Sequence, residues 1–137
     1  MPPRLVPELI CSDLERSRAF YCGVLGFGVR YARHEERFLY LERDGAELML
    51  EQPLESDRLF PRAELVRPFG RGVNLEIDVD DVEAVHSAVL GAGLEPFLPL
   101  EERSYERAED VIRVRQFAVE DPDGYLLRFS QRLAGGV

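Results

Sequence analysis

Short runs in which apolar and polar residues alternate are interspersed with two longer stretches whose apolar residues recur every three to four positions. The first pattern is typical of a strand with one buried face, and the second is typical of an amphipathic helix. The first half of the chain predicts, in order, a strand at 6–12, a helix within 12–27, and strands at 27–32, 37–43 and 46–52. The second half predicts a strand at 73–79, a helix within 81–93, strands at 95–100, 113–120 and 125–131, and a charged loop at 101–112.

The two halves also share their local signals. Ser12 with Glu15, and Asp80 with Glu83, have the spacing of a capping box, which predicts where each helix begins. A shift of 79 positions (124 minus 45) places Gly45 on Gly124, and it also places Met49 on Arg128 and Phe38 on Phe117. A repeat of this length indicates duplicated structural units.

The order of elements therefore predicts an α+β fold of two tandem βαβββ modules in a single domain over residues 1–137. The first module spans about 4–53, a connector rich in proline and glycine spans about 54–72, and the second module spans about 73–132. We expect a curved mixed sheet around a cleft, with the helices on the outer face. The following residues are predicted to form the apolar face under the helices: Leu9, Leu48, Leu50, Val73, Leu75, Ile77, Leu127 and Phe129. Strand alternation puts these residues on the cleft side: Glu8, Glu47, Met49, Glu51, Asn74, Glu76, Arg128 and Ser130.

Composition narrows the functional classes. The net charge of −9 disfavours nucleic acid as a partner, since binding its backbone requires concentrated Lys and Arg. No apolar run approaches the length of a membrane span, and the N-terminus lacks a secretory pattern, so we expect a cytoplasmic protein. Cys11 and Cys22 are expected to be reduced, since no CxxC motif is present.

Four segments carry a resemblance to a known family: SDLERSRAFYCGVLGFGVRY (12–31), GAELMLEQ (45–52), VNLEIDVDDVEAVHSAVLGAG (73–93) and EDPDGYLLRF (120–129). Together they resemble the vicinal oxygen chelate superfamily, which includes glyoxalase I, bleomycin-resistance proteins, fosfomycin-resistance proteins and extradiol dioxygenases. The chain is most similar to the bleomycin-resistance-like branch. The resemblance implies paired βαβββ modules, commonly in a homodimer.

Enzymes of that superfamily hold a divalent metal through one residue from the first strand and one from the last strand of each module. The resemblance assigns those four positions to Val6, Met49, Asn74 and Arg128. Hard divalent cations prefer carboxylate oxygen or imidazole nitrogen, and none of these four residues supplies either. We therefore expect no metal and no other cofactor.

Bleomycin-resistance proteins lack the metal and sequester a large cationic glycopeptide, so the resemblance implies a binding protein for a cationic antibiotic or similar small molecule in a dimer cleft. The candidate ligand-binding residues are Phe38, Tyr40, Met49, Glu51, Asn74, Glu76, Tyr105 (in the predicted 101–112 loop) and Arg128. Glu51 and Arg128 are also candidates for an ion pair with each other. The alternative is a lyase, isomerase or dioxygenase of the same superfamily that uses a divalent metal or acid/base groups. In the acid/base case, Glu51 or Glu76 would act as the base and Arg128 would stabilise an oxyanion.

Overall fold

The computed structural model describes residues 3–54, 60–61 and 64–134. The chain divides into two units. The first contains the residues up to Arg71 together with Pro122–Gly124, and the second contains Gly72–Asp121 and the residues from Tyr125 onward. No helix in the described ranges is long and apolar enough to cross a membrane.

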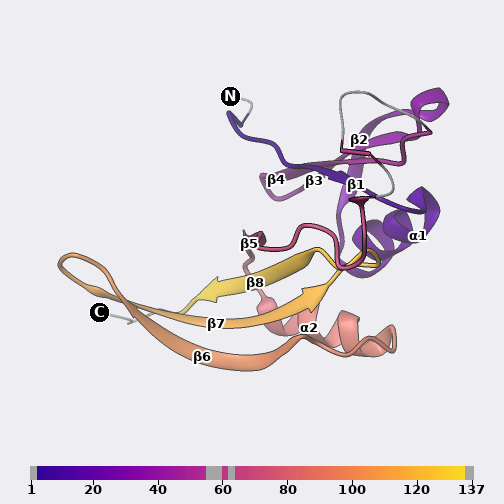
Figure 1. The fold of residues 1–137 in the computed structure, drawn as a ribbon. Helices are drawn as coiled ribbons and strands as arrows, with labels where there is room; N and C mark the ends of the chain where they lie inside the picture. The colour runs from indigo at the N-terminus through magenta and orange to yellow at the C-terminus, as the bar shows by residue number, and fades with distance from the viewer. Residues whose placement is uncertain (1–2, 55–59, 62–63, 135–137) are drawn as a thin grey trace. The chain divides into compact units, whose positions relative to one another are not determined.

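The first unit contains one βαβββ module (Figure 1). Its elements are β1 (Glu8–Ile10), α1 (Leu14–Arg18), the π-helix η1 (Ala19–Val24), β2 (Gly28–Arg33), the 3-10 turn η2 (His34–Glu36), β3 (Phe38–Arg43) and β4 (Ala46–Glu51). The sheet order is β1-β4-β3-β2, with β1 parallel to β4 and the other neighbours antiparallel. This is the mixed sheet predicted for a module.

The second unit repeats this order. Its elements are β5 (Asn74–Asp78), α2 (Val82–Gly91), β6 (Leu98–Glu106), β7 (Val111–Glu120) and β8 (Leu126–Arg132). The sheet order is β5-β8-β7-β6, again with one parallel pair, β5 and β8. The prediction of an α+β fold with two tandem βαβββ modules is therefore confirmed.

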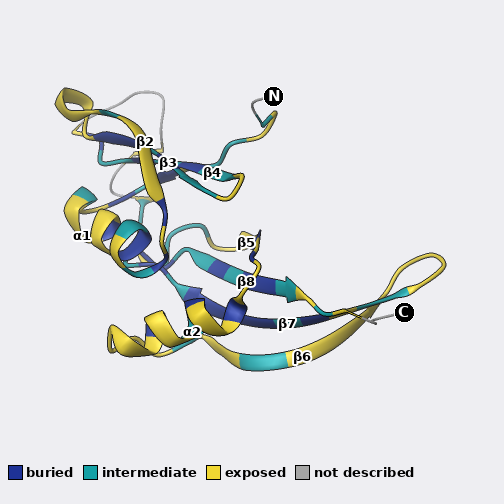
Figure 2. Ribbon diagram, turned by 180° about the vertical axis from the view of Figure 1, so that it is seen from behind, coloured by how far each residue is buried: buried dark blue, intermediate teal, exposed yellow. Residues whose placement is uncertain are grey.

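The predicted loop at 101–112 is wrong. These residues form most of β6 and the beginning of β7, joined by a turn in which Arg107 pairs with Asp110. The hairpin runs well beyond α2, and much of β6 is exposed (Figures 1 and 2). Because charged residues occupy both faces of the outer hairpin, its sequence lacks the apolar alternation that identifies a half-buried strand.

Each sheet buries one face. In the first unit that face includes Leu9, Leu48 and Leu50, and β4 packs against α1. In the second unit Phe117 stacks on Phe129, with ring centroids 5.6 Å apart, and His86 of α2 meets the Phe117 ring edge-on.

Six of the eight residues in the predicted buried set are buried, and Leu75 is half-buried. Val73 lies just before β5 and is 53% exposed, because the sheet begins only at Asn74.

The helix caps differ from prediction by one residue. Asp13 and Asp81 are the N-caps: the Asp13 carboxylate accepts from the backbone N–H groups of Glu15 and Arg16, and that of Asp81 accepts from the N–H of Ala84. Aspartate is as good an N-cap as serine. The capping-box spacing therefore pointed to Ser12 and Asp80, each one residue before the true N-cap.

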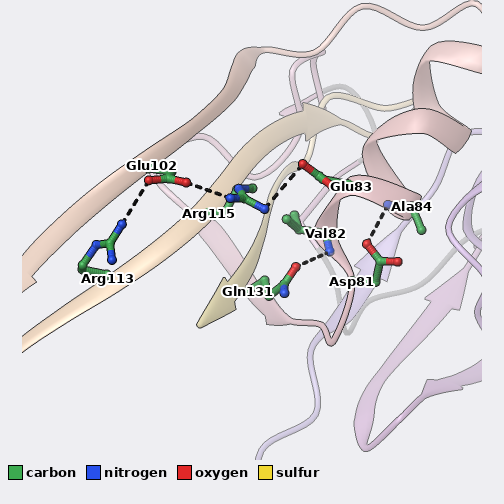
Figure 3. A network of polar contacts seen from close by, with 8 residues as sticks. All are labelled: Asp81, Val82, Glu83, Ala84, Glu102, Arg113, Arg115 and Gln131. Atoms are coloured by element: carbon green, nitrogen blue, oxygen red, sulfur yellow. Dashed lines mark hydrogen bonds and ion pairs between the residues drawn. The ribbon is translucent and has the colours of Figure 1, made fainter. Parts of the chain in front are cut away.

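A second, duplicated contact supports each helix start. Gln52 Oε1 accepts from Leu14 N at 2.8 Å, and Gln131 Oε1 accepts from Val82 N at 3.0 Å (Figure 3 shows the second contact). The two glutamines are themselves 79 positions apart (131 minus 52). In both modules the end of the last strand therefore satisfies a free N–H group of the helix.

Ser12 is not the N-cap, and it forms hydrogen bonds with the turn between β7 and β8. Its hydroxyl donates to Asp123 Oδ1 at 2.5 Å, and its backbone N–H donates to Asp123 Oδ2 at 3.0 Å. The N–H of Phe69 donates to the Asp123 carbonyl at 2.8 Å. These bonds explain why Pro122–Gly124 group with the first unit although their neighbours belong to the second.

Candidate functional site

A cavity of about 420 Å³ lies on the face of the second sheet opposite to α2. Strand alternation determines this side: Phe117 and Phe129 point toward the helix, so Arg128 and Ser130 point away from it. The lining residues come from all four strands of this sheet: Glu76, Asp78, Tyr105, Ile112, Val114, Arg128, Ser130 and Arg132.

The charged groups of the cavity come from two adjacent strands. Glu76 and Asp78 lie on β5, and Arg128 and Arg132 lie on β8. Glu76 is paired with Arg128 in the register, and their side chains form an ion pair with Arg128 Nη2 3.3 Å from Glu76 Oε2. The cavity therefore carries two carboxylates and two guanidinium groups.

Tyr105 forms the aromatic part of the wall. It faces the cavity from β6, and its hydroxyl accepts a hydrogen bond from Gln116 Nε2 at 2.7 Å. Gln116 is only 5% exposed, so the tyrosine side chain is held by a buried partner. Tyr105 was predicted as a loop residue, and its position in a strand is what directs it at the cavity.

Two buried polar atoms on this face lack a hydrogen-bond partner. Among the described residues, three buried side-chain atoms are unsatisfied: Ser17 Oγ, Gln116 Oε1 and Arg128 Nε. Two of the three belong to the cavity face of the second sheet. Such atoms are uncommon in folded proteins because each one costs free energy.

The first unit has a face of aromatic and acidic side chains. Tyr31 stacks on Tyr40 with ring centroids 4.9 Å apart, and the Arg33 guanidinium lies 4.0 Å from the centroid of the Phe38 ring. The Tyr40 hydroxyl donates to Glu47 Oε1 at 2.9 Å. Burial raises the pKa of Tyr40, and the carboxylate of Glu47 raises it further, so the phenol remains protonated.

Glu51 belongs to the same face and contacts another carboxyl group. Its side chain is hydrogen-bonded to Glu8 of β1, and this bond, burial and the charge of Glu8 raise the pKa of Glu51 from 4.5 to about 7. Strand register explains the contact: Glu8 lies opposite Met49 on the parallel neighbour, and Glu51 is the next residue of β4 on the same face. The suggested Glu51–Arg128 ion pair stays a prediction, and within its own sheet Arg128 pairs with Glu76.

The structure thus places the eight predicted ligand-binding residues in two groups. Glu76, Tyr105 and Arg128 line the cavity of the second unit, and Asn74 lies on the same strand face as Glu76 but not in the lining. The remaining four, Phe38, Tyr40, Met49 and Glu51, lie on one face of the first sheet.

Several other residues of the cavity and of the first-sheet face were not predicted from the sequence. In the cavity these are Asp78, Arg132, Ile112 and Val114, and in the first unit it is Tyr31. Continuing the alternation of β5 and β8 by one more step would have found Asp78 and Arg132.

The residues at the superfamily's metal positions do not fit a divalent cation. Met49 offers only a thioether, and the Arg128 guanidinium would repel a cation while pairing with the nearest carboxylate, Glu76. Within the described ranges, no three His, Cys, Asp or Glu side chains are close enough to hold an ion together. The donor atoms at these positions therefore do not suit a divalent metal.

Two βαβββ modules, each with a mixed four-stranded sheet and a helix on one face, define the class of proteins to which this fold belongs. The family model of the Glyoxalase/Bleomycin resistance protein/Dioxygenase superfamily matches residues 5–129, and the chain belongs to that superfamily. The predicted family is therefore confirmed at the level of the superfamily. No match was found among curated proteins.

Several solved structures are similar to this chain. A glyoxalase/bleomycin resistance protein/dioxygenase superfamily member from Vibrio splendidus 12B01 is 40% identical, with 95% of this chain and 98% of that chain covered and a TM-score of 0.44. A virulence protein from Salmonella typhimurium is 24% identical, with 97% and 99% covered and a TM-score of 0.68. TioX from Micromonospora sp. ML1 is 22% identical, with 96% and 99% covered and a TM-score of 0.67. The last two share the fold with this chain.

Proposed function

We propose that this protein is a small-molecule-binding protein of the bleomycin-resistance type, which captures its ligand by non-covalent binding without a metal. The observation that carries the proposal is the 420 Å³ cavity of the second unit. Its volume lies within the range of roughly 300–1,000 Å³ found for small-molecule sites. Its lining combines an apolar and aromatic wall with four charged groups, which can fix the orientation of a ligand.

The buried polar atoms on the cavity face that lack a hydrogen-bond partner also support ligand binding. Gln116 Oε1 and Arg128 Nε are buried without a protein partner in the described part of the chain, so both could bond to a ligand. The opposite face of the same sheet provides the contrast. There Glu102 accepts from Arg115 at 2.7 Å and from Arg113 at 3.2 Å, while Arg115 also contacts Glu83 of α2 (Figure 3).

The first test is whether the purified protein carries a bound ligand. Native mass spectrometry of the protein purified from its own source should show a bound small molecule in a one-to-one ratio with the chain, released unchanged on denaturation. A chain whose mass is always that of the polypeptide alone, even after incubation with extracts of small metabolites, would contradict capture.

The second test addresses the antibiotic version of the proposal. Isothermal titration with bleomycin or phleomycin should show binding that weakens about tenfold in Asp78→Asn, the size of effect that loss of one charged hydrogen bond produces. Glu15→Gln, a change of one exposed carboxylate on α1, should leave the affinity unchanged. Absence of heat with both drugs would exclude these two compounds as ligands.

A second candidate function is acid/base catalysis, favoured by the hydrogen-bonded carboxyl pair of Glu51 and Glu8. A general base works best when its pKa lies near the operating pH, and the pKa of about 7 at Glu51 meets that condition. If Glu51 removes a proton from carbon, the recovered ligand incubated with protein in D₂O will gain deuterium. Glu51→Gln should abolish that exchange and Glu35→Gln should preserve it, and a lack of exchange with the unmodified protein would contradict this candidate.

A further inference from the structure

We infer that the cavity of the second unit selects a zwitterionic ligand with an apolar body, its cationic group at Asp78 and its anionic group at Arg132. This inference rests on the proposed function and specifies the chemical class of the ligand.

The first step is the distribution of charge. Glu76 and Arg128 already form an ion pair, so they largely neutralise each other. In the described part of the chain, neither Asp78 nor Arg132 forms an ion pair within 4 Å. One carboxylate and one guanidinium of the lining are therefore available to a ligand.

The second step is the register of the strands. Asp78 lies opposite Ser130, and Arg132 is two residues beyond Ser130 on the same face of β8. Two residues of a strand span about 7 Å, so Asp78 and the long side chain of Arg132 can reach opposite charges of one small molecule. β5 ends at Asp78 while β8 continues to Arg132, so the two free charges lie at one end of the cavity.

The third step is the wall beside these charges. Val114 is the register partner of Arg132, and Ile112 is the partner of Tyr105, so the floor next to Arg132 is apolar and aromatic. Because the Tyr105 hydroxyl accepts from Gln116 Nε2, its own proton is available to donate to an anionic group of the ligand. An apolar body can pack on this wall while its polar ends reach Asp78 and Arg132.

The fourth step excludes ligands of a single charge. A simple cation would satisfy Asp78 but would leave Arg132 repelling it, and a simple anion would meet the reverse situation. The net charge of −9 favours cations over the whole surface, so a preference for a zwitterion has to come from the cavity itself.

The experiment uses three compounds with the same indole ring: tryptophan, which is zwitterionic, tryptamine, which is a cation, and indole-3-propionate, which is an anion. Calorimetry at about 0.15 M salt, where long-range attraction is screened, should show tryptophan binding at least about tenfold more tightly than either of the others. Arg132→Gln should reduce the affinity for tryptophan about tenfold and should not weaken tryptamine. Asp78→Asn should reduce tryptophan binding to the same degree and should not weaken indole-3-propionate.

Two matched variants control for charge alone. Asp80→Asn alters an exposed carboxylate after β5, and Arg113→Gln alters an arginine on the opposite face of β7 that contacts Glu102. Both should leave the affinity for tryptophan unchanged.

Tryptamine binding as tightly as tryptophan would overturn the inference in favour of a cation site. Failure of all three compounds to bind would also overturn it, as would a recovered natural ligand with charge of only one sign. The mass-spectrometric search for a bound ligand is independent of these titrations, so capture can hold while the zwitterion assignment fails.

Discussion

Gly45 and Gly124 occupy the same position in the two modules, yet only one of them is enclosed. Both have a positive φ, +91° and +95° respectively. A Cβ atom at residue 45 would have no neighbour within 4 Å, whereas at residue 124 it would lie 2.5 Å from the Cβ and 2.6 Å from the Cα of Pro68. Two glycines at equivalent positions are therefore under different steric constraints.

We predict that Gly124→Ala destabilises the protein much more than Gly45→Ala. The backbone strain of a left-handed alanine costs about 1–2 kcal/mol at both sites, and the clash with Pro68 adds roughly 1–3 kcal/mol at residue 124. Urea unfolding of the two variants measures the difference. Equal losses would show that residues 67–69 move aside without cost.

At the level of single residues, the sequence located part of the site. Arg128 and Glu76 were identified from their positions in a repeated strand, and the structure places both in the cavity. Tyr105 was chosen for its ring but assigned to a loop, and its contact with Gln116 links strands whose register no local pattern reveals. The Glu8–Glu51 contact escaped prediction because it depends on the parallel pairing of β1 and β4.

At the level of elements, the helices depend on the strands that follow them. Gln131, near the end of β8, accepts a hydrogen bond from the first N–H group of α2, and Gln52, just after β4, does the same for α1. We predict that Gln131→Leu lowers the free energy of unfolding by about 1 kcal/mol, since it leaves Val82 N without this acceptor.

Gln131→Glu is the matched control. It keeps an acceptor oxygen and adds negative charge near a helix N-terminus, so its stability should equal or exceed that of the unmodified protein. Thermal unfolding distinguishes the two variants. A Gln131→Glu variant as unstable as Gln131→Leu would mean that the amide N–H₂ group, rather than the carbonyl, is what matters.

The elements themselves were predicted well where burial of one face makes apolar and polar residues alternate, and poorly where it does not. Strands β3, β4 and β8 were found because one face of each is buried, whereas the outer part of β6 carries charge on both faces. In that region pairing between the strands creates the structure, and cross-strand ion pairs such as Arg113–Glu102 support it.

At the level of the whole molecule, the raised pKa of Glu51 makes stability depend on pH. The group titrates near 4.5 in the unfolded chain and near 7 in the folded one, so the folded state binds the proton more tightly. Its favourable contribution is complete below about pH 4.5 and is lost as the pH rises through 7. Glu8 and Glu36 act in this direction, and Arg33 opposes them.

We therefore predict that Glu51→Gln raises the melting temperature at pH 8 and leaves it nearly unchanged at pH 4. A gain on the order of 1 kcal/mol corresponds to about 4 °C for a chain of this size. Glu35→Gln, at an exposed residue of η2, removes the same charge and should show a smaller change at pH 8. A Glu51→Gln effect that is equal at both pH values would mean that the pair does not share a proton.

The hydrogen bonds of Asp123 have a consequence for the order in which the chain is made. Ser12 and Phe69 are synthesised before the second repeat, but the carboxylate and carbonyl that they bond belong to Asp123, in the turn between β7 and β8. Domains often fold in sequence as they leave the ribosome, N-terminal parts first. Here the first unit stays incomplete until the turn at Asp123 has emerged, so the two repeats finish folding together rather than one after the other.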